Sequence, residues 1–541
     1  MRNADFIVVG GGAAGAVMAA RLSEDPDTNV LLLEAGGRAR GPLFSVPLMT
    51  GLLLRGGVAN WGYATEPEAN LDGRRLKWPR GKALGGSTAI NGMVWRRGLP
   101  LDFDLWAQAG LKGWSWREVA PAFEKAERRQ PGAGASLGVA GPLPVSRGQL
   151  ENPLYDAWIA AALALGYPAT DDFNGVAGHG VGRYDFSIHR GQRMSSARAY
   201  LNPAMQRPNL QVQTRMRVLR LLIEGGRCIG VEAHDGNEVL RLHARREVIL
   251  SGGAINSPQL LMLSGIGPAD ALRQHGIAPH VDLPGVGASL QDHLMVRVEY
   301  RAREAVTLDR LRRIDTAALA FLRAVTLGTG PAASFPLEAG GLLKSEPGLD
   351  APDLQTSIMP ALSAASLRLP GFGRQLAPDR GNGFFSNIFQ MRPNSRGHIA
   401  LASADPMAPP LIYPNYLSAP PDRAVLRRGV KMLREIYAHS AFDRYRGEEL
   451  SPGPNVTSDH DIDRWISASA DTVFHPTSTC RMGADNDPGA VVDDRLRVRG
   501  VAGLRVVDAS VMPAVTSGNT AAPTIMIAEQ AARFIRDAPS I

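Results

Sequence analysis

"DFIVVGGGAAGAVMAARLSEDPDTNVLLLEAGG", residues 5–37, opens with an apolar run, residues 6–9, that is typical of a buried parallel strand. The glycine pattern G-x-G-x-x-G comes next, at Gly10, Gly12 and Gly15. Such glycines give a tight turn, close approach of the backbone to a pyrophosphate, and close packing of helix on strand. We expect a helix over residues 14–22, which directs its N-terminal N–H groups at the phosphates.

A second apolar run, residues 30–33, ends at Glu34, nineteen residues beyond Gly15. An acidic side chain at this place accepts hydrogen bonds from the hydroxyls of an adenosine ribose. Because strand, turn, helix, strand and acid occur in this order, the segment predicts a dinucleotide site rather than a structural glycine-rich turn. Glu34 disfavours a 2′-phosphate, and hence NADP, but the local pattern does not separate FAD from NAD.

The composition is that of a globular protein long enough for two domains or one large composite unit. Hydrophobic residues make up 44% of the 541 residues and charged residues 21%, an ordinary balance for a folded chain. The 59 Lys and Arg against 52 Asp and Glu give a net charge of +7. No block of five or six like charges marks a nucleic-acid arm, so we expect no nucleic-acid partner.

Cysteine and histidine usage argues against a disulfide framework and against a metal site. Cys228 and Cys480 lie far apart without a CxxC pattern, which favours a reducing compartment. The eleven histidines form no HExxH and no paired ligand spacing. No run of eighteen or more uncharged apolar residues occurs, so we expect no integral membrane segment. Nucleotide binding explains the first apolar run better than a signal peptide does, so we expect a cytoplasmic location, with peripheral membrane association left open.

Three further segments place small, polar loops beside helices. "GKALGGSTAINGMVWRRG", residues 81–98, offers backbone N–H groups and hydroxyls to a phosphate or a flat ring. "GGAINSPQLLMLSGIGP", residues 252–268, has a small-residue turn, a helix expected from about Ser257, and another glycine pair. "GLRVVDASVMPAVTSGNTAAPTIMIAEQAARFI", residues 503–535, has a strand over 504–507, Asp508 at its end, a polar loop and a closing amphipathic helix.

Together these segments resemble the glucose-methanol-choline (GMC) family of FAD-dependent oxidoreductases. Residues 81–98 look like the first signature of that family, and residues 253–267 look like its second. Three more segments resemble family segments, so the resemblance covers nearly the whole chain: "LPGVGASLQDH" (283–293), "PNSRGHIAL" (393–401) and "HPTSTCRMG" (475–483). "DFNG" (172–175) and "SSARAYLNP" (195–203) are similar to the choline-dehydrogenase-like branch.

The resemblance implies an α/β fold, α+β overall, made of two interleaved parts. A Rossmann-type FAD-binding domain would comprise residues 1–155, 205–295 and 465–541. A substrate-binding domain, built on an antiparallel sheet with helices, would comprise residues 156–204 and 296–464. The implied activity is FAD-dependent oxidation of a small-molecule alcohol, expected to be primary, to the aldehyde.

The resemblance and the glycine fingerprint together predict how FAD is held. Relatives that attach FAD covalently place a histidine just before the asparagine of the first signature. This chain has Ile90 there, so we expect noncovalent binding. Asp508 is expected near the ribitol, and Val94 and Val218 as backbone contacts. The predicted FAD-binding residues are Gly10, Gly12, Ala13, Ala14, Gly15, Glu34, Ala35, Gly85, Gly86, Ser87, Asn91, Gly92, Met93, Val94, Val218, Gly253, Asp508, Ala509, Asn519 and Thr520.

"FHPTSTCRMG", residues 474–483, contains the predicted catalytic base. Oxidising an alcohol with a flavin requires a proton to leave the hydroxyl and a hydride to leave the carbon. Histidine, with an ordinary pKa of about 6.5, is well suited to accept that proton. An amide or a second imidazole nearby can hydrogen-bond the developing alkoxide. The resemblance assigns these roles to His475 and Asn519, and Pro476 rigidifies the backbone beside the base.

Several questions stay open from the sequence. The electron acceptor is O2 in an oxidase, or a quinone or another acceptor in a dehydrogenase, and the motifs do not separate the two. Glu338, in "FPLEAGG" (335–341), could face a cationic substrate or be a structural carboxylate. The identity of the alcohol and the oligomeric state are not predicted.

Two other classes of function are disfavoured. "GASLG", residues 134–138, matches the nucleophile motif G-x-S-x-G of serine hydrolases. That motif needs a hydrophobic strand before the serine and a helix after it, and the flanking residues here predict neither, so we expect a surface loop. A non-catalytic flavoprotein is disfavoured because both predicted catalytic residues are present.

Overall fold

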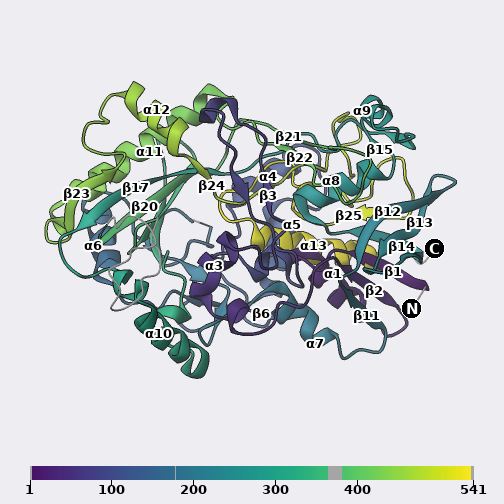
Figure 1. The fold of residues 1–541 in the computed structure, drawn as a ribbon, viewed down its shortest axis with the longest axis horizontal. Coiled ribbons are helices and arrows are strands. Elements are labelled where there is room, and N and C mark those ends of the chain that lie inside the picture. Colours follow the sequence, from purple (N-terminus) through teal and green to yellow (C-terminus); the bar gives the residue numbers. More distant parts are fainter. Residues whose placement is uncertain (1–2, 177, 364–380, 538–541) are drawn as a thin grey trace.

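The computed structural model describes residues 3–176, 178–363 and 381–537. Within these residues the chain forms two seven-stranded sheets that lie toward opposite ends of the molecule, with helices around each (Figure 1). Helices α1 (Ala13–Leu22) and α13 (Ala521–Arg536) lie with the first sheet. Helices α11 (Pro420–Ala438) and α12 (Asp459–Ser469) lie with the second.

The first sheet has a parallel core, as the apolar runs near the N-terminus predict. Its order is β11-β2-β1-β14-β13-β12, with β25 beside β14. The neighbours β11, β2, β1, β14 and β25 are all paired in parallel, whereas β12 and β13 add an antiparallel hairpin. The bounds are β1 (Asn3–Val9), β2 (Val30–Glu34), β11 (Leu210–Thr214), β12 (Arg217–Glu224), β13 (Arg227–His234), β14 (Val239–Leu250) and β25 (Leu504–Val506).

The register of this sheet brings the carboxyl ends of its parallel strands to one edge. Val9 of β1 lies opposite Leu33 of β2 and Leu250 of β14, and Leu250 lies opposite Val506 of β25. In open sheets with parallel strands, ligands bind outside this edge. The residues that continue the chain there are Gly10, Glu34, Ser251 and Val507.

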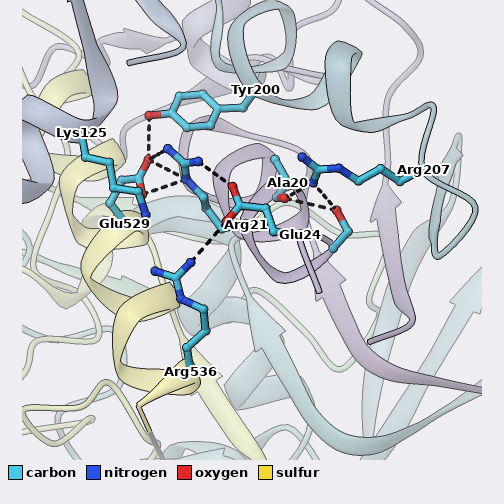
Figure 2. Close-up of polar contacts among 9 residues, drawn as sticks. Ala20, Arg21, Glu24, Lys125, Tyr200, Arg207, Glu529 and Arg536 are labelled. Atoms are coloured by element: carbon cyan, nitrogen blue, oxygen red, sulfur yellow. Dashed lines mark hydrogen bonds and ion pairs between the residues drawn. The ribbon is translucent and has the colours of Figure 1, made fainter. Parts of the chain in front are cut away.

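A buried ion pair joins α1 to the C-terminal helix α13 (Figure 2). Arg21 on α1 donates three hydrogen bonds of 2.7 to 3.0 Å to the carboxylate of Glu529 on α13, and the Tyr200 hydroxyl donates a fourth at 3.0 Å. Glu529 is only 2% exposed. Removing one partner of a buried pair leaves an uncompensated charge, which costs about 3–5 kcal/mol. The pair therefore holds α13, which follows the loop that contains Asn519, against α1.

The second sheet is antiparallel, in the order β23-β17-β20-β19-β18-β7 with β24 beside β17. Helix α11 packs against β17 and β20, and α6 (Pro153–Ala164) packs against β7, β18 and β19. The bounds are β7 (Gly180–Arg183), β17 (Leu294–Ala302), β18 (Ala339–Leu343), β19 (Leu354–Met359), β20 (Gly383–Gln390), β23 (Arg446–Ser451) and β24 (Asp471–Thr472).

The strands of the two sheets come from alternating segments of the chain, so the predicted interleaving is confirmed. The exact domain limits stay a prediction. The helix predicted over residues 14–22 is α1, and the helix predicted from Ser257 is α8 (Gly253–Leu263), which begins four residues earlier. The other α-helices of the described residues are α2 (Pro42–Ser45), α3 (Thr50–Arg55), α4 (Pro100–Gln108), α5 (Trp116–Ala126), α7 (Asn202–Ala204), α9 (Ala269–Gln274) and α10 (Ile314–Leu327).

In the part of the chain that the structure describes, no helix is long and apolar enough to cross a membrane. The remaining strands of this part are short. These strands are β3 (Tyr63–Ala64), β4 (Lys77–Trp78), β5 (Glu127–Arg129), β6 (Leu143–Arg147), β8 (Asp185–Phe186), β9 (Ile188–His189), β10 (Gln192–Arg193), β15 (Ile266–Gly267), β16 (Val281–Asp282), β21 (His398–Ala400) and β22 (Leu411–Tyr413).

Candidate active site

A cavity of about 770 Å³ lies between the carboxyl edge of the first sheet and one face of the second. The residues that line it come from the glycine turn after β1, the ends of β2 and β14, the loop over residues 86–94, and strands β17, β19 and β20. The His475 loop and the start of α13 complete the wall. Its volume is in the upper part of the range for small-molecule sites, about 300–1,000 Å³.

The glycine turn packs so closely that side chains are excluded at two of its three fingerprint positions. Gly10 has a φ of +99°, and a Cβ there would lie 2.5 Å from the carbonyl oxygen of Ser251. A Cβ on Gly15 would lie 1.8 Å from the carbonyl oxygen of Gly10, so this glycine lets α1 pack on β1. A Cβ on Gly12 would meet nothing closer than 3.9 Å, because Gly12 faces the cavity. The geometry matches the division of roles that the fingerprint predicts.

Glu34 lines the cavity and also holds the glycine turn. Its Oε2 accepts a hydrogen bond from the backbone N–H of Gly11 at 2.8 Å, and its Oε1 accepts one from Gly36 at 2.7 Å. Burial raises the pKa of Glu34, and these two hydrogen bonds oppose the rise. Each carboxylate oxygen keeps a second lone pair, so the side chain can still accept from ribose hydroxyls.

A buried arginine holds the loop of the first signature. Arg193 donates to the carbonyl oxygen of Asn91 at 2.5 Å and to its Oδ1 at 2.9 Å, and it also contacts the Thr50 hydroxyl. All the hydrogen-bond partners of Arg193 are neutral oxygens, and burial lowers the pKa of its guanidinium to about 9. Asn91 therefore lies in the cavity wall with its side chain already fixed in orientation.

Asp508 closes the same edge behind β25. Its Oδ2 accepts from the backbone N–H of Gly253 at 2.8 Å and from the Ser257 hydroxyl at 2.6 Å, and its Oδ1 accepts from the N–H of Ser510 at 2.8 Å. Burial raises its pKa, against these hydrogen bonds. Asp508 thus joins β25 to the start of α8, and both Asp508 and Gly253 line the cavity.

His475 and Asn519, predicted as the catalytic pair, lie together in the cavity wall. His475 Nε2 is 3.2 Å from Asn519 Nδ2. Gln355 Nε2 donates to Asn519 Oδ1 at 3.2 Å, which leaves the amide nitrogen of Asn519 as the group that faces the histidine. Since an amide NH2 only donates, His475 Nε2 is the acceptor in this contact.

A second imidazole determines the tautomer of His475. His475 Nδ1 lies 2.9 Å from Nδ1 of His293, and His293 Nε2 lies 2.8 Å from the carbonyl oxygen of Met391. A carbonyl only accepts, so His293 Nε2 carries a proton and the Nδ1 of a neutral His293 carries none. The proton between the rings therefore belongs to His475 Nδ1. This hydrogen-bond network assigns the lone pair of His475 to Nε2, the atom beside Asn519.

Both rings are held in the neutral form. Burial lowers the pKa of His293 to about 4. The pKa of His475 lies well below its ordinary value, mainly because of burial and further because of the positive charge of His293, when protonated, and of Arg80. A neutral imidazole is the form that accepts a proton, so His475 is ready to act as a base at neutral pH.

Residues 291–293 hydrogen-bond to the loop that contains His475 and hold it in place. The backbones of Gln291 and Thr477 hydrogen-bond to each other in both directions, at 2.9 and 3.2 Å. Asp292 Oδ1 accepts from the backbone N–H of His475 at 2.6 Å, and its Oδ2 accepts from the hydroxyls of Thr472 and Tyr416. Burial raises the pKa of Asp292 to about 6. The segment "LQDH", noted in the sequence only as similar to a family segment, thus positions the predicted base.

Most predicted site residues line the cavity, and two do not. Gly15 packs α1 on β1, and Gly85 donates its N–H to the carbonyl oxygen of Gly11 at 2.7 Å. The sequence did not single out His293, Asp292 or Gln355. The predicted residues in the cavity wall are Gly10, Gly12, Ala13, Ala14, Glu34, Ala35, Gly86, Ser87, Asn91, Gly92, Met93, Val94, Val218, Gly253, His475, Asp508, Ala509, Asn519 and Thr520.

Two side chains that the sequence left in question lie outside the cavity wall. Glu338 is fully buried and pairs with Arg183 at 2.8 Å, which makes it a structural carboxylate. Ser136, of the G-x-S-x-G match, lies in a loop between β5 and β6, and its hydroxyl has no hydrogen-bond partner among the described residues. In the part of the chain that the structure describes, no histidine hydrogen-bonds this serine, so the structure gives no support to a hydrolase.

Comparison with known proteins agrees with this geometry. The GMC oxidoreductase family model matches in two parts, the N-terminal part over residues 4–295 and the C-terminal part over residues 393–528. The chain belongs to the GMC oxidoreductase family. The resemblance read from the sequence is thereby confirmed, and with it FAD as the cofactor and CH–OH groups as the donors.

Curated relatives and solved structures align with nearly all of this GMC oxidoreductase. It is 43% identical to the mitochondrial choline dehydrogenase of Mus musculus, covering 99% of this chain and 90% of that protein. It is 42% identical to an oxygen-dependent choline dehydrogenase of Brucella ovis, covering 98% and 95%. A pyridoxine 4-oxidase from Mesorbium loti superposes with a TM-score of 0.88 at 33% identity, covering 99% and 100%. A formate oxidase from Aspergillus oryzae superposes with a TM-score of 0.90 at 28% identity, covering 99% and 98%.

The cavity has the donors and acceptors that FAD requires. No side chain caps the N-terminus of α1, so the N–H groups of its first turn are available to a pyrophosphate. Gly12 leaves room for close approach of the backbone, and Glu34 lies at the end of β2 with acceptor capacity for a ribose. These features of the described residues suit FAD.

Proposed function

We propose that this GMC oxidoreductase oxidises a primary alcohol to the aldehyde, with His475 as the base and Asn519 as its partner. The observation that supports this best is that His475 Nε2, the nitrogen that carries the lone pair, lies in the cavity wall in contact with the amide donor of Asn519. When bound, FAD supplies the acceptor for the hydride that leaves the carbinol carbon. The two electrons leave the alcohol with that hydride, and the hydroxyl proton leaves separately.

The residues of the chain account for the proton and for the charge on oxygen. His475 Nε2 accepts the hydroxyl proton, which forms an imidazolium whose Nδ1–H still bonds His293. Asn519 Nδ2, which contacts His475 Nε2 at 3.2 Å, is placed to donate to the substrate oxygen as negative charge develops there. Gln355 keeps that amide in the required orientation through Asn519 Oδ1.

We further propose that FAD is held noncovalently by the residues predicted from the sequence. Ile90 lines the cavity at the place where a histidine would be needed for a bond to the flavin, and its side chain has no nucleophilic atom. The cytoplasmic location also stays a prediction.

The test is a reaction followed in two stages. Anaerobic mixing of the holoenzyme with a primary alcohol should bleach the oxidised flavin spectrum, and a secondary alcohol of equal size should do so more slowly. The rate of flavin reoxidation on subsequent exposure to air then distinguishes O2 from another electron acceptor. Rapid return of the yellow colour with formation of hydrogen peroxide indicates an oxidase, whereas slow return that a quinone accelerates indicates a dehydrogenase. A holoenzyme that no alcohol bleaches would overturn the proposal.

A further inference from the structure

Three strands of the second sheet form the wall opposite the His475 loop, and their side chains lie in rows. The row nearest the catalytic pair is Met295, Phe389 and Gln355, in register on β17, β20 and β19. Gln355 bonds Asn519, and the ring of Phe389 lies 6.1 Å from that of His475, edge to face. The next row is Arg297, Asn387 and Ser357, about 7 Å further along the strands.

These two rows present no free negative charge to a substrate. The acidic side chains that line the described part of the cavity are Glu34, Asp471 and Asp508. Glu34 and Asp508 lie at the nucleotide edge, each bonded to backbone N–H groups. Asp471 on β24 lies opposite Met295 of the first row. Its Oδ2 is 3.3 Å from Nη2 of Arg297 in the second row, so it is already paired with a cation.

Glu338, the carboxylate in the segment "FPLEAGG", is turned away from the cavity. Its neighbours Phe335 and Leu337 line the cavity, whereas Glu338 is fully buried on the other side. There it accepts from Arg183 and from the backbone N–H of Leu150, both at 2.8 Å, and from the hydroxyl of Ser334. Its acceptors are used within the protein, so it does not offer a site to a substrate cation.

Positive charge lies near Gln355, one member of the first row. Arg96 is fully buried, and none of its three guanidinium nitrogens has a hydrogen-bond partner among the described residues. A Cβ built on Gly518 would lie 3.4 Å from Arg96 Nε and 3.2 Å from Gln355 Oε1, so this guanidinium lies close behind Gln355. Within a low dielectric, such a charge repels a second cation placed near Asn519.

The aromatic side chains do not compensate for this lack of negative charge. Tryptophan is the best ring for holding a quaternary ammonium. Trp61 is the tryptophan that lines the described cavity, and Lys82 Nζ and the Arg217 guanidinium already lie 4.7 and 5.4 Å from its ring. The other aromatic side chains in the wall are Phe335, Phe385, Phe389 and Phe474, which offer an apolar surface.

We infer that the substrate of this enzyme is a neutral primary alcohol with an apolar body, an alkyl chain or an aromatic ring, and that a quaternary ammonium alcohol such as choline is a poor substrate. This inference rests on the proposed function and names its substrate class. Choline places its charge two carbons from the hydroxyl. With the hydroxyl at His475, that charge must lie between the first two rows, where the wall is neutral or positive except at Asp471, which is already paired with Arg297.

The test compares two alcohols of the same shape. Choline and 3,3-dimethylbutan-1-ol differ only in the replacement of the nitrogen cation by a carbon atom. In anaerobic stopped-flow reduction of the holoenzyme, the neutral alcohol should exceed choline by roughly 100-fold in the second-order rate constant, because burying an unpaired cation is costly. Benzyl alcohol and 1-hexanol should reduce the flavin faster still. Choline equal to or better than its neutral counterpart would overturn the inference while leaving the proposed function intact.

Failure of the proposed function gives a different result. If none of these alcohols, choline included, reduces the flavin, both the function and the substrate class are wrong. If choline alone does so, only the substrate class is wrong. Tetramethylammonium, tested as an inhibitor of 1-hexanol oxidation, should not compete, and competitive inhibition at concentrations that leave the ionic strength unchanged would count against the inference.

Variants of the Arg297–Asp471 ion pair give a second, independent test. Arg297→Gln leaves Asp471 without its cation, so the ratio of choline to 3,3-dimethylbutan-1-ol should rise roughly tenfold. Arg297→Lys keeps the charge and should keep the ratio. Glu338→Gln should leave the ratio unchanged, although it lowers thermal stability. A ratio that falls in Glu338→Gln would identify Glu338 as a cation site after all, and should that variant fail to fold, the wild-type comparison still decides.

Discussion

The Nδ1 atoms of His475 and His293 lie 2.9 Å apart, and the single proton between them determines which nitrogen of His475 faces the cavity. A carboxylate in the place of His293 would also orient the ring, but it would stabilise the imidazolium and raise the pKa of the base. A neutral imidazole orients His475 without adding negative charge. His475 Nε2 therefore stays unprotonated before the reaction, and His293 Nδ1 keeps accepting the hydrogen bond from His475 Nδ1–H during it.

Replacing the base should have a large and specific effect. We expect His475→Ala to lose roughly 10²–10⁴-fold in the rate of flavin reduction, the usual contribution of a positioned general base. Asn519→Ala should lose less, of order 10–10³-fold, because the donor to the oxygen is removed but the base survives. FAD content of His475→Ala should stay near that of the wild type, since His475 is not assigned to FAD binding. Anaerobic stopped-flow spectroscopy with a good primary alcohol measures both rates.

The double variant is the control for the shared role of this pair. Both side chains act on one substrate oxygen, so the losses in His475→Ala and Asn519→Ala should not add. A His475→Ala enzyme that reduces its flavin at close to the wild-type rate would show that the base is another residue.

His293 should behave as a positioning residue for His475. His293→Phe removes the acceptor for His475 Nδ1–H, so the lone pair of His475 can reside on either nitrogen and the rate of flavin reduction should fall about tenfold or more. His293→Asn provides an Oδ1 at the place of Nδ1 and should restore part of the rate. The diagnostic readout is the pH profile of reduction, whose acid limb should shift in His293→Phe. An unchanged profile with a uniformly lower rate would indicate a structural role alone.

The parts of this site that were predictable from the sequence are those whose determinants are local. Gly10, Gly12, Gly15 and Glu34 lie within one short segment, and their spacing alone specifies turn, helix and acid. The contact between His293 and His475 spans 182 residues, so it depends on how the two segments meet in the fold. Both segments were recognised as similar to the family, but nothing in either shows that it faces the other.

Glu338 illustrates the same limit in the opposite direction. A lone acid in a glycine-rich segment is compatible with a substrate site or with a structural role. The distinction depends on Arg183, which lies 155 residues earlier on β7 and forms the ion pair that buries the carboxylate. Such a partner cannot be predicted from the residue type of Glu338 or from the spacing of its neighbours.

The shifted pKa values predict how activity and stability depend on pH. Because the pKa of His475 lies well below about 6.5, the rate of flavin reduction should stay level as pH falls from 8 to 6.5 and should decline only at more acidic pH. The proton that His475 accepts in the reaction cannot be accepted once the ring is already protonated. A rate that halves near pH 7 would mean that the base is not held in this buried, neutral state.

His293 contributes a separate dependence of the free energy of unfolding on pH. Its pKa is about 4 in the folded protein and about 6.5 when unfolded, so its contribution is fully present above pH 6.5 and is lost as pH falls through 4. The loss amounts to about 3 kcal/mol. Asp292, with a pKa raised to about 6, acts in the opposite sense, since its contribution is lost as pH rises through 6. Comparing the melting temperature of wild type and His293→Phe from pH 7 to 4 isolates the histidine, because Asp292 is common to both.

Ile90 predicts that FAD is released when the protein unfolds. Acid precipitation of the purified yellow protein should leave the flavin in the supernatant, where its absorption spectrum can be recorded. The comparison variant is Ile90→His, which places an imidazole at the position that covalent relatives use. Flavin retained in the wild-type pellet would contradict noncovalent binding.

Glu34 has two roles that can be measured separately. Its carboxylate accepts the backbone N–H groups of Gly11 and Gly36, and it is predicted to accept from the adenosine ribose as well. In Glu34→Ala, loss of charge-assisted hydrogen bonds worth about 1.5–3 kcal/mol should weaken FAD binding by roughly 10- to 150-fold. The stability of the apoprotein should also fall, because two buried N–H groups lose their acceptor. Glu34→Gln keeps an acceptor oxygen for only one of these N–H groups, so its stability and FAD affinity should lie between those of the wild type and Glu34→Ala.

The two roles of Glu34 are measured on the same apoprotein. Titration with FAD, followed by fluorescence, gives the FAD affinity, and thermal melting gives the stability that the glycine turn contributes. An apoprotein that melts at a lower temperature but binds FAD as tightly as the wild type would place the adenosine elsewhere and leave Glu34 with its structural role alone.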